Sequence, residues 1–319
     1  MISSNYSVTG YSPGLQPKLR KPVDLFFVIE IINFYYLEYE YKVFGMMQGS
    51  LCKIERAFQA GGRQPNEDHL CCKQDLFAVF DGSSSLTPQL YSGQTGAWWA
   101  SYLAGSEFSK NNAPLFDLGD RANRRLKTAM SAAGVPADDR LACWSASAAA
   151  VRIDEDYAEW LQIGDCQVVA IAADGSYQLL TSGHNHDRPT LLHLKGLIER
   201  NVPSPHQALR PHIEAVRLRM NREYGVLNGD IKAADFFSGG KIPLTDIRHL
   251  LLFTDGLLPP LENPEQEHDI DRIVALYLEG GLALVQQQVR LMEASDPDCS
   301  RYPRFKRHDD IAAIALSLQ

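Results

Sequence analysis

Short apolar runs that stop at polar or glycine-containing turns dominate the pattern from residue 51 onward. Residues 76–80, 144–153, 157–163, 168–172, 177–180, 249–253 and 311–318 have the length and composition of β-strands. Apolar positions at helical spacing predict helices over 93–104, 120–134, 206–222 and 268–293, the last interrupted at Gly280-Gly281. Asp174-Gly175 is the strongest hairpin signal. Because strands outnumber helices and the hairpins are sequential, we expect an α+β fold with helices outside antiparallel sheets.

The first 45 residues have a different pattern. They hold ten of the thirty aromatic residues, and the apolar run at 25–29 is short and flanked by acidic residues. Such a run is too short for a membrane span, and no signal-peptide cleavage site follows it. Because Met46-Met47 precedes the first well-patterned segment, we expect the natural start there. Residues 1–45 would then be an extension outside the fold, or alternatively a docking arm, and residues 46–319 a single domain.

Composition narrows the function classes. The chain of 319 residues has 31 basic and 39 acidic side chains, a net charge of −8, and 45% hydrophobic residues. That hydrophobicity excludes wholesale disorder, and the acidic balance argues against nucleic acid or an anionic membrane as the main partner. The six cysteines lack the paired spacing of zinc sites or secreted disulfide scaffolds. We therefore expect a cytoplasmic protein with reduced thiols.

Acidic residues recur at the ends of the predicted strands. Three strands end in an aspartate beside a glycine, a fourth begins after an acidic pair, and another acidic pair lies before the first: Asp81-Gly82, Gly164-Asp165, Asp255-Gly256, Asp309-Asp310 and Glu67-Asp68. One such pair is typical of a turn, as at Asp174-Gly175. Several converging carboxylates without matching cations would repel one another. Mg²⁺ or Mn²⁺, which prefers oxygen ligands, would relieve that repulsion.

These motifs resemble those of the metal-dependent serine/threonine phosphatases of the PPM type, also called the PP2C family, in their bacterial form. The resemblance covers residues 51–319 and keeps the family order. The matching motifs are Arg63-Gln-Pro-Asn-Glu67-Asp68, Phe77-Ala-Val-Phe-Asp81-Gly82, Gly93 to Ser101, Ser145-Ala-Ser-Ala-Ala, Ile163-Gly-Asp165-Cys166, Tyr224-Gly-Val-Leu-Asn-Gly229, Leu250-Leu-Leu-Phe-Thr-Asp255-Gly256-Leu257 and Asp309-Asp310-Ile-Ala-Ala-Ile.

The resemblance implies a four-layer αββα sandwich of two antiparallel sheets flanked by helices, with two Mn²⁺ or Mg²⁺ ions at one end. It implies that Asp81 bridges both ions and that Arg63 binds the substrate phosphate, because a planar guanidinium can bind two phosphate oxygens at once. The remaining metal-site residues that it implies are Glu67, Asp68, Gly82, Asp255, Asp309 and, for a weaker third ion, Asp165. The implied activity is hydrolysis of phosphoserine and phosphothreonine in proteins by a metal-activated water, with a cognate kinase as a candidate partner.

Three departures from the family pattern leave alternatives open. Ser83 to Ser85 follow Asp81-Gly82, where many relatives carry a histidine nearby, and Pro259 replaces a usual aspartate. Asp310 replaces a usual asparagine, so Asp309 and Asp310 compete for the ligand role, and we favour Asp309. The first alternative function is a regulatory or binding protein of this fold with weakened catalysis. The second is a phosphatase of small-molecule phosphate esters.

Two further groups of residues have ordinary structural interpretations. The arginines at 217, 219 and 222 are expected on a solvated helix face, with docking of a phosphoprotein as the alternative. His184 and His186 are expected in a polar loop or cleft wall rather than in a zinc site.

Overall fold

The computed structural model describes residues 51–136, 138–181 and 186–319. The predictions for residues 1–45 and for His184 lie outside the described residues. Within the described part of the chain, no helix is both long enough and apolar enough to cross a membrane.

In the described part of the chain, ten strands form two antiparallel sheets of five strands each. Sheet A contains, in spatial order, β1 (Leu51–Gln59), β10 (Ile311–Leu318), β9 (Ile247–Phe253), β6 (Gln167–Ala172) and β7 (Tyr177–Leu179). Sheet B contains β2 (His69–Lys73), β3 (Leu76–Gly82), β4 (Ala146–Ile153), β5 (Tyr157–Ile163) and β8 (Ser238–Pro243). Every strand pair is antiparallel, as expected from the sequential hairpins.

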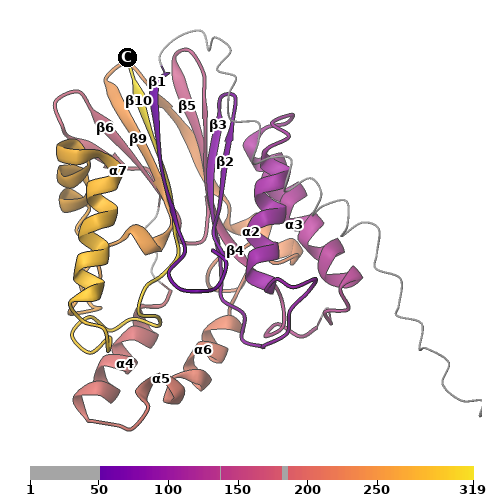
Figure 1. Cartoon of the computed structure of the whole chain (residues 1–319). Helices are drawn as coiled ribbons and strands as arrows, with labels where there is room; N and C mark the ends of the chain where they lie inside the picture. The colour runs from indigo at the N-terminus through magenta and orange to yellow at the C-terminus, as the bar shows by residue number, and fades with distance from the viewer. Residues whose placement is uncertain (1–50, 137, 182–185) are drawn as a thin grey trace, which may run out of the picture. The chain divides into compact units, whose positions relative to one another are not determined.

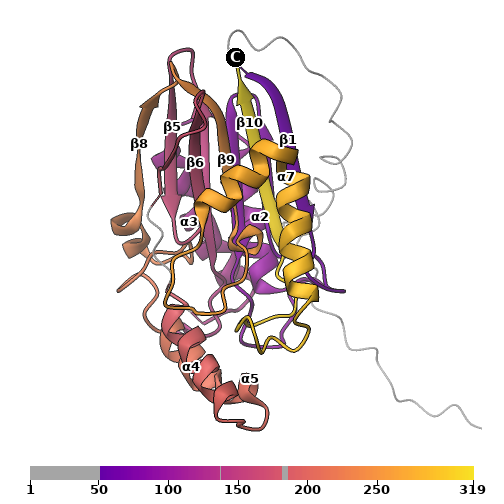
Figure 2. The same cartoon turned by 90° about the vertical axis from the view of Figure 1, so that its left-hand side faces the viewer.

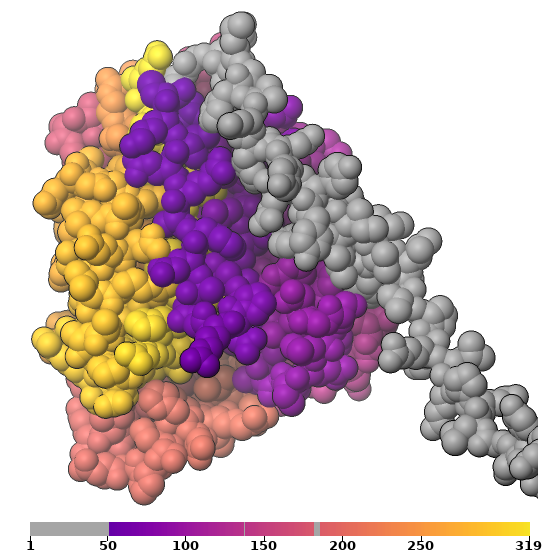
Figure 3. Space-filling view, viewed as in Figure 1, coloured from indigo at the N-terminus to yellow at the C-terminus, as the bar shows by residue number. Residues whose placement is uncertain are grey.

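Helices cover the outer faces of both sheets and one end of the sandwich. The outer helices are α7 (Ile270–Ala294) on sheet A and α2 (Gly96–Phe108) with α3 (Leu115–Ala132) on sheet B, so the four layers are seen edge-on in Figure 1. Figure 2 views the same layers from the side of α7. The short helices α4 (Arg188–Glu199), α5 (Pro205–Ala208) and α6 (Arg210–Arg217) lie beyond the end of the sheets opposite the C-terminus. They form the lower end of the face seen in Figure 3. Two 3₁₀ turns are η1 (Ile231–Phe236) and η2 (Asp255–Leu257).

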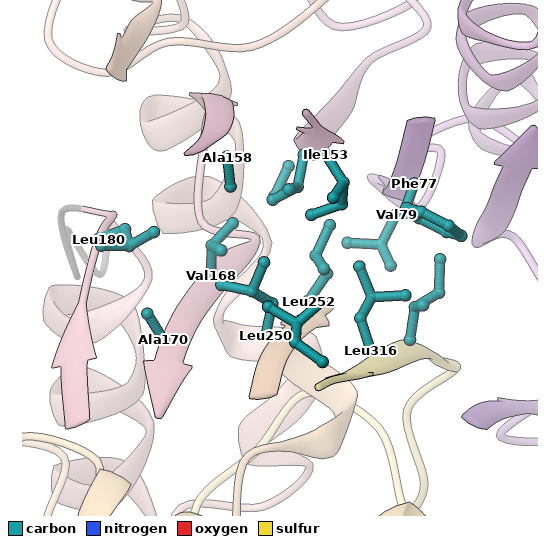
Figure 4. Close-up of a cluster of buried hydrophobic side chains, with 14 of the residues drawn as sticks. Phe77, Val79, Ile153, Ala158, Val168, Ala170, Leu180, Leu250, Leu252 and Leu316 are labelled. Carbon is teal, nitrogen blue, oxygen red and sulfur yellow. The ribbon is translucent and has the colours of Figure 1, made fainter. Parts of the chain in front are cut away.

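The core has two apolar layers because strand residues alternate between the faces of a sheet. Val168 of β6 and Leu250 and Leu252 of β9 point between the sheets, where Phe77 of β3 meets them (Figure 4). The intervening residues of β6 and β9 face α7 and pack against its buried side. A smaller buried cluster of Leu194, Leu197 and Leu209 joins α4 to the following helices.

The structure confirms most of the predicted elements. The α+β class is confirmed, as are the strand ends at Gly82, Ile163 and Phe253 and the hairpin between β6 and β7. Helix α7 has non-helical backbone angles at Gly280 and Gly281, where the break was expected. The single helix predicted over 206–222 was wrong, since α5 ends at Ala208 and α6 covers only Arg210–Arg217.

Candidate metal centre

The strand register of sheet B brings two acidic residues to one end of that sheet. His69, the first residue of β2, pairs with Phe80 near the end of β3. Asp68 and Asp81 therefore lie next to each other along neighbouring strands. Asp81 itself pairs with Ser147 of β4, so it is held in the ladder and its carboxyl position is set by three strands.

Sheet A contributes its acidic residues at the same end. Phe253, the last residue of β9, pairs with Gln167 at the start of β6 and with Ala313 near the start of β10. The acidic residues that flank these strand ends are Asp165, Asp255, Asp309 and Asp310. This end faces α4, α5 and α6 in Figure 1.

Two glycines permit the close approach of these chain segments. A Cβ on Gly82 would overlap the backbone carbonyl oxygens of Glu67 and Ala97, and a Cβ on Gly256 would overlap that of Asp310. The glycine beside each aspartate therefore has a packing role that an isolated turn would not need.

The carboxyl groups affect one another strongly. Burial raises the pKa of Asp81 well above its usual range, and the nearby Asp68, Asp255, Asp165 and Asp309 raise it further. Burial is also the largest cause of the raised pKa values of Asp68 and Asp255, to which neighbouring aspartates again add. The side chain of Asp81 acts in the opposite direction on Asp255 and partly lowers its pKa. The sequence motifs therefore converge into one group of repelling acids.

Two hydroxyl groups hold the Glu67 side chain. Ser84 Oγ donates to Glu67 Oε2 at 2.8 Å, and Thr95 Oγ1 donates to Glu67 Oε1 at 2.6 Å. Thr95 is also the N-cap of α2, where its hydroxyl accepts from the Trp98 backbone N–H. Asp68 is likewise held, because Thr254 Oγ1 donates to its Oδ2 at 2.8 Å.

Asp309 and Asp310 have different partners. The two oxygens of Asp310 accept from the backbone N–H groups of Gly61 and Glu67, each at 2.7 Å. Asp309 Oδ1 instead accepts from the Lys306 ammonium at 2.8 Å. Asp310 thus joins the β1–β2 connection to β10, whereas Asp309 lies in the wall of a cavity, which is the more suitable position for a ligand.

Lys306 is a site residue that sequence reasoning missed. Burial opposes its positive charge, but the Asp309 carboxylate outweighs burial and raises the pKa of Lys306, with Asp81 and Glu67 adding to the effect. Lys306 is therefore a permanent cation beside the acidic group. Its only sequence signal is a spacing of three residues before Asp309, which is common in exposed loops.

Arg63 lies in the connection between β1 and β2 and is exposed. Among the described residues it makes no hydrogen bond or ion pair. A guanidinium in this state remains available for an anionic ligand.

Arg217 has a role different from the solvated one predicted. Its two terminal nitrogens donate to the Ser145 hydroxyl at 3.0 Å and to the Ser84 carbonyl at 2.8 Å. It therefore links α6 to the segment after Asp81, and the expectation of a wholly solvated side chain was wrong. His186 stacks on Tyr224, with ring centroids 4.1 Å apart, and its Nδ1 lies 3.7 Å from Asp165 Oδ2.

The donor chemistry fits a hard divalent cation. All acidic donors supply oxygen, and their raised pKa values reflect burial and mutual repulsion that a dication would relieve. In the described part of the chain, however, no three His, Cys, Asp or Glu side chains form a ready metal-holding group. Glu67 instead accepts hydrogen bonds from Ser84 and Thr95, and Asp309 accepts one from Lys306. Ion binding would exchange some of these bonds.

A cavity of about 410 Å³ adjoins the acidic group. Asp165, Asp255 and Asp309 form part of its wall, together with Asp187 and Lys306. Burial raises the pKa of Asp187, a second residue that the sequence motifs did not indicate. The acidic group is therefore accessible from a space large enough for a ligand.

Solved structures with the same fold support this architecture. The Mycobacterium tuberculosis serine/threonine phosphatase PstP/Ppp has a TM-score of 0.52 and 15% identity, over 85% of this chain and 99% of that chain. The Mycobacterium smegmatis PPM Ser-Thr phosphatase MsPP, in complex with cacodylate, has a TM-score of 0.50 and 17% identity, over 85% and 100%. The catalytic domain of PstP in complex with two manganese ions has a TM-score of 0.51 and 14% identity, over 84% and 98%.

Sequence comparison goes beyond the fold. No curated protein matches the chain. A sequence model of the family described as protein phosphatase 2C matches residues 60–287, which include the motifs from Arg63 to Asp255. The chain therefore belongs to the protein phosphatase 2C family.

Proposed function

We propose that this chain is a phosphoprotein phosphatase that hydrolyses phosphoserine and phosphothreonine with two Mn²⁺ or Mg²⁺ ions. The observation that carries the proposal is the convergence of acidic residues from both sheets at one accessible end of the sandwich. A phosphorylated protein is the substrate, and the kinase that phosphorylates it is the expected functional counterpart.

Each residue has a distinct task in this proposal. Asp81, Asp255 and Asp309, with Glu67 directly or through water and the Gly82 carbonyl, would hold the ions. Asp68 would orient bound water, and Asp165 would serve a weaker third ion. When bound, two such ions activate a water molecule and hold a phosphoryl oxygen. Arg63 would bind the substrate phosphate through charge-assisted hydrogen bonds.

One observation favours a second candidate function, a binding protein of this fold with weak hydrolysis. Lys306 already satisfies Asp309, and Ser83 follows Asp81-Gly82 where a histidine is common nearby. A missing general acid costs about 10²- to 10⁴-fold in rate when nothing replaces it.

The test is Mn²⁺-dependent hydrolysis of a phosphothreonine peptide, compared with an aryl phosphate and with small phosphate esters. We expect hydrolysis of the peptide that EDTA abolishes, and a loss of more than about 100-fold in Asp81→Asn, since even outer-shell partners of a metal contribute 10- to 100-fold. Asp174→Asn, at the exposed β6–β7 turn, is the matched control. Tight Mn²⁺ binding without hydrolysis would favour the binding protein. A higher kcat/KM for small esters than for peptides would favour a metabolite phosphatase.

A further inference from the structure

The cavity beside the acidic group has an apolar side that the proposed chemistry does not use. Its wall includes Leu191 of α4, Leu258 and Leu261 of the segment after η2, and Phe305 before β10. All four side chains are partly exposed. Exposed apolar surface beside a charged centre is unfavourable unless a ligand covers it.

Two of the three leucines, Leu191 and Leu261, lie outside the buried apolar clusters described above. Leu258 packs against the layer between sheet A and α7, and Phe305 packs against the cluster of α4 and α5. Leu191 and Leu261 belong to neither cluster, and both line the cavity. Leu191 and Leu261 come from segments far apart in the sequence. Their common position in the cavity wall therefore does not follow from being neighbours in a single loop.

We infer that this side of the cavity receives an apolar side chain of the phosphoprotein, one or two residues from the phosphorylated serine or threonine. The inference rests on the proposed function. Leu258 follows Asp255 by three positions and Phe305 precedes Asp309 by four, so the apolar wall continues directly from the acidic group. Neighbouring residues of a peptide are about 3.8 Å apart, which lets one peptide occupy both ends.

The charges around the cavity favour an apolar over an acidic neighbour. In the described part of the wall, Arg304 is bound by Asp296 at 2.8 Å, and Lys306 pairs with Asp309 until an ion takes that carboxylate. Asp187 adds an acidic group to the wall, and Glu267 adds another that is paired with Arg188. An acidic side chain at the same peptide position would be repelled by these carboxylates, and no new interaction would compensate for its loss of hydration.

The first experiment measures kcat/KM for phosphothreonine peptides in an alanine background, with Mn²⁺ present. Leucine, then glutamate, replaces alanine at each of the two positions on either side of the phosphothreonine. We expect leucine at one of these positions to raise kcat/KM about tenfold over alanine, which is the lower range for apolar groups in a pocket. Glutamate at the same position should lower it.

The second experiment links the preference to the cavity. Leu261→Ala should reduce the leucine preference to about threefold or less. The control Leu278→Ala removes the same atoms from an exposed leucine of α7 that does not line the cavity, and should keep the full preference. Binding of labelled peptides that carry a phosphonate in place of the phosphate, measured by fluorescence anisotropy, should show the same order without turnover.

The outcomes separate this inference from the proposed function. Equal kcat/KM for alanine and leucine peptides, with robust hydrolysis of both, would overturn the inference alone. A preference that survives unchanged in Leu261→Ala would also overturn it. Hydrolysis of aryl phosphate but of no phosphopeptide would overturn the proposed substrate class and the inference with it.

Discussion

The neighbours Asp309 and Asp310 provide a sharp test of how the site is built. Asp310 uses both carboxylate oxygens to accept backbone N–H groups, at Gly61 and Glu67, each at 2.7 Å. Asp310→Asn keeps one acceptor and turns an amide NH₂ toward the other N–H group. The variant should therefore lower stability while it keeps the acidic group that binds the ions.

The magnitude follows from these bonds. A hydrogen bond to a charged group contributes about 1.5–3 kcal/mol, and Asp310→Asn loses one and weakens the other. Because Asp310 is only partly buried, water can replace part of the lost hydrogen bonding. We therefore expect the free energy of unfolding to fall by about 2 kcal/mol. For a domain of this size that corresponds to a fall in Tm of about 4–8 °C.

Asp309→Asn is the matched control. Its ion pair with Lys306 is partly exposed and should contribute at most about 1 kcal/mol, and its hydrogen bond from the Asp310 backbone N–H can persist with an amide oxygen. Both substitutions relieve repulsion on Asp68, so the difference between them isolates the backbone bonds. In EDTA, Asp309→Asn should therefore shift Tm by at most about 2–4 °C, half of the fall expected for Asp310→Asn.

The assay pairs thermal unfolding in EDTA with isothermal titration of Mn²⁺ at pH 7. Asp310→Asn should unfold early but retain both ion sites, and Asp309→Asn should unfold normally but lose affinity at one site. Early unfolding of Asp309→Asn together with loss of an ion site in Asp310→Asn would contradict these two roles. An unchanged Tm in Asp310→Asn would contradict them as well.

Three further predictions concern single side chains. Because the pKa of Asp81 is raised in the folded protein, the metal-free protein loses stability as pH rises from about 3.9 toward that pKa. In EDTA, the Tm of Asp81→Asn should therefore be roughly 2–4 °C above that of the unsubstituted protein at pH 7 and equal to it at pH 4. Arg63→Ala should lower kcat/KM for a phosphopeptide about 10- to 100-fold, mainly through KM, whereas exposed Arg272→Ala should not. Burial would raise the pKa of Asp296, but hydrogen bonds from backbone N–H groups and from a guanidinium hold that pKa well below its usual range. Asp296→Asn should therefore lower the free energy of unfolding in urea by about 2–3 kcal/mol at pH 7, and this difference should narrow as pH falls below about 3.9.

The sequence was most informative where a motif combines a strand with its end. Asp81 and Asp255 were predictable because each follows a buried apolar run and precedes a glycine that close packing requires. The strand pairing seen in the structure then brings these ends to the same end of the sandwich. The sequence could not show which hydrogen bonds each carboxylate makes, since these depend on loops far away in the chain.

Two of the missed elements, β8 and α4, lacked a local pattern. β8, Ser238–Pro243, is an edge strand with two glycines and one apolar residue, and α4 begins after a polar turn with no side-chain N-cap bond. Lys306 and Arg217 were misjudged for a related reason. A long cation looks the same in sequence whether it is solvated or directed at an acidic group, and only the tertiary contacts decide between these states.

The site combines groups that cost stability with groups that preserve geometry. Asp81, Asp68 and Asp255 repel one another when no cation is present, so each should weaken the metal-free fold near neutral pH. Asp310 carries out the opposite task, because it ties β10 to the segment that contains Glu67. Separate residues for these tasks allow the acidic group to remain assembled without an ion and to gain stability when one binds. Ion binding should therefore raise Tm by mass action, and more strongly at pH 8 than at pH 5, where protons compete for the same carboxylates.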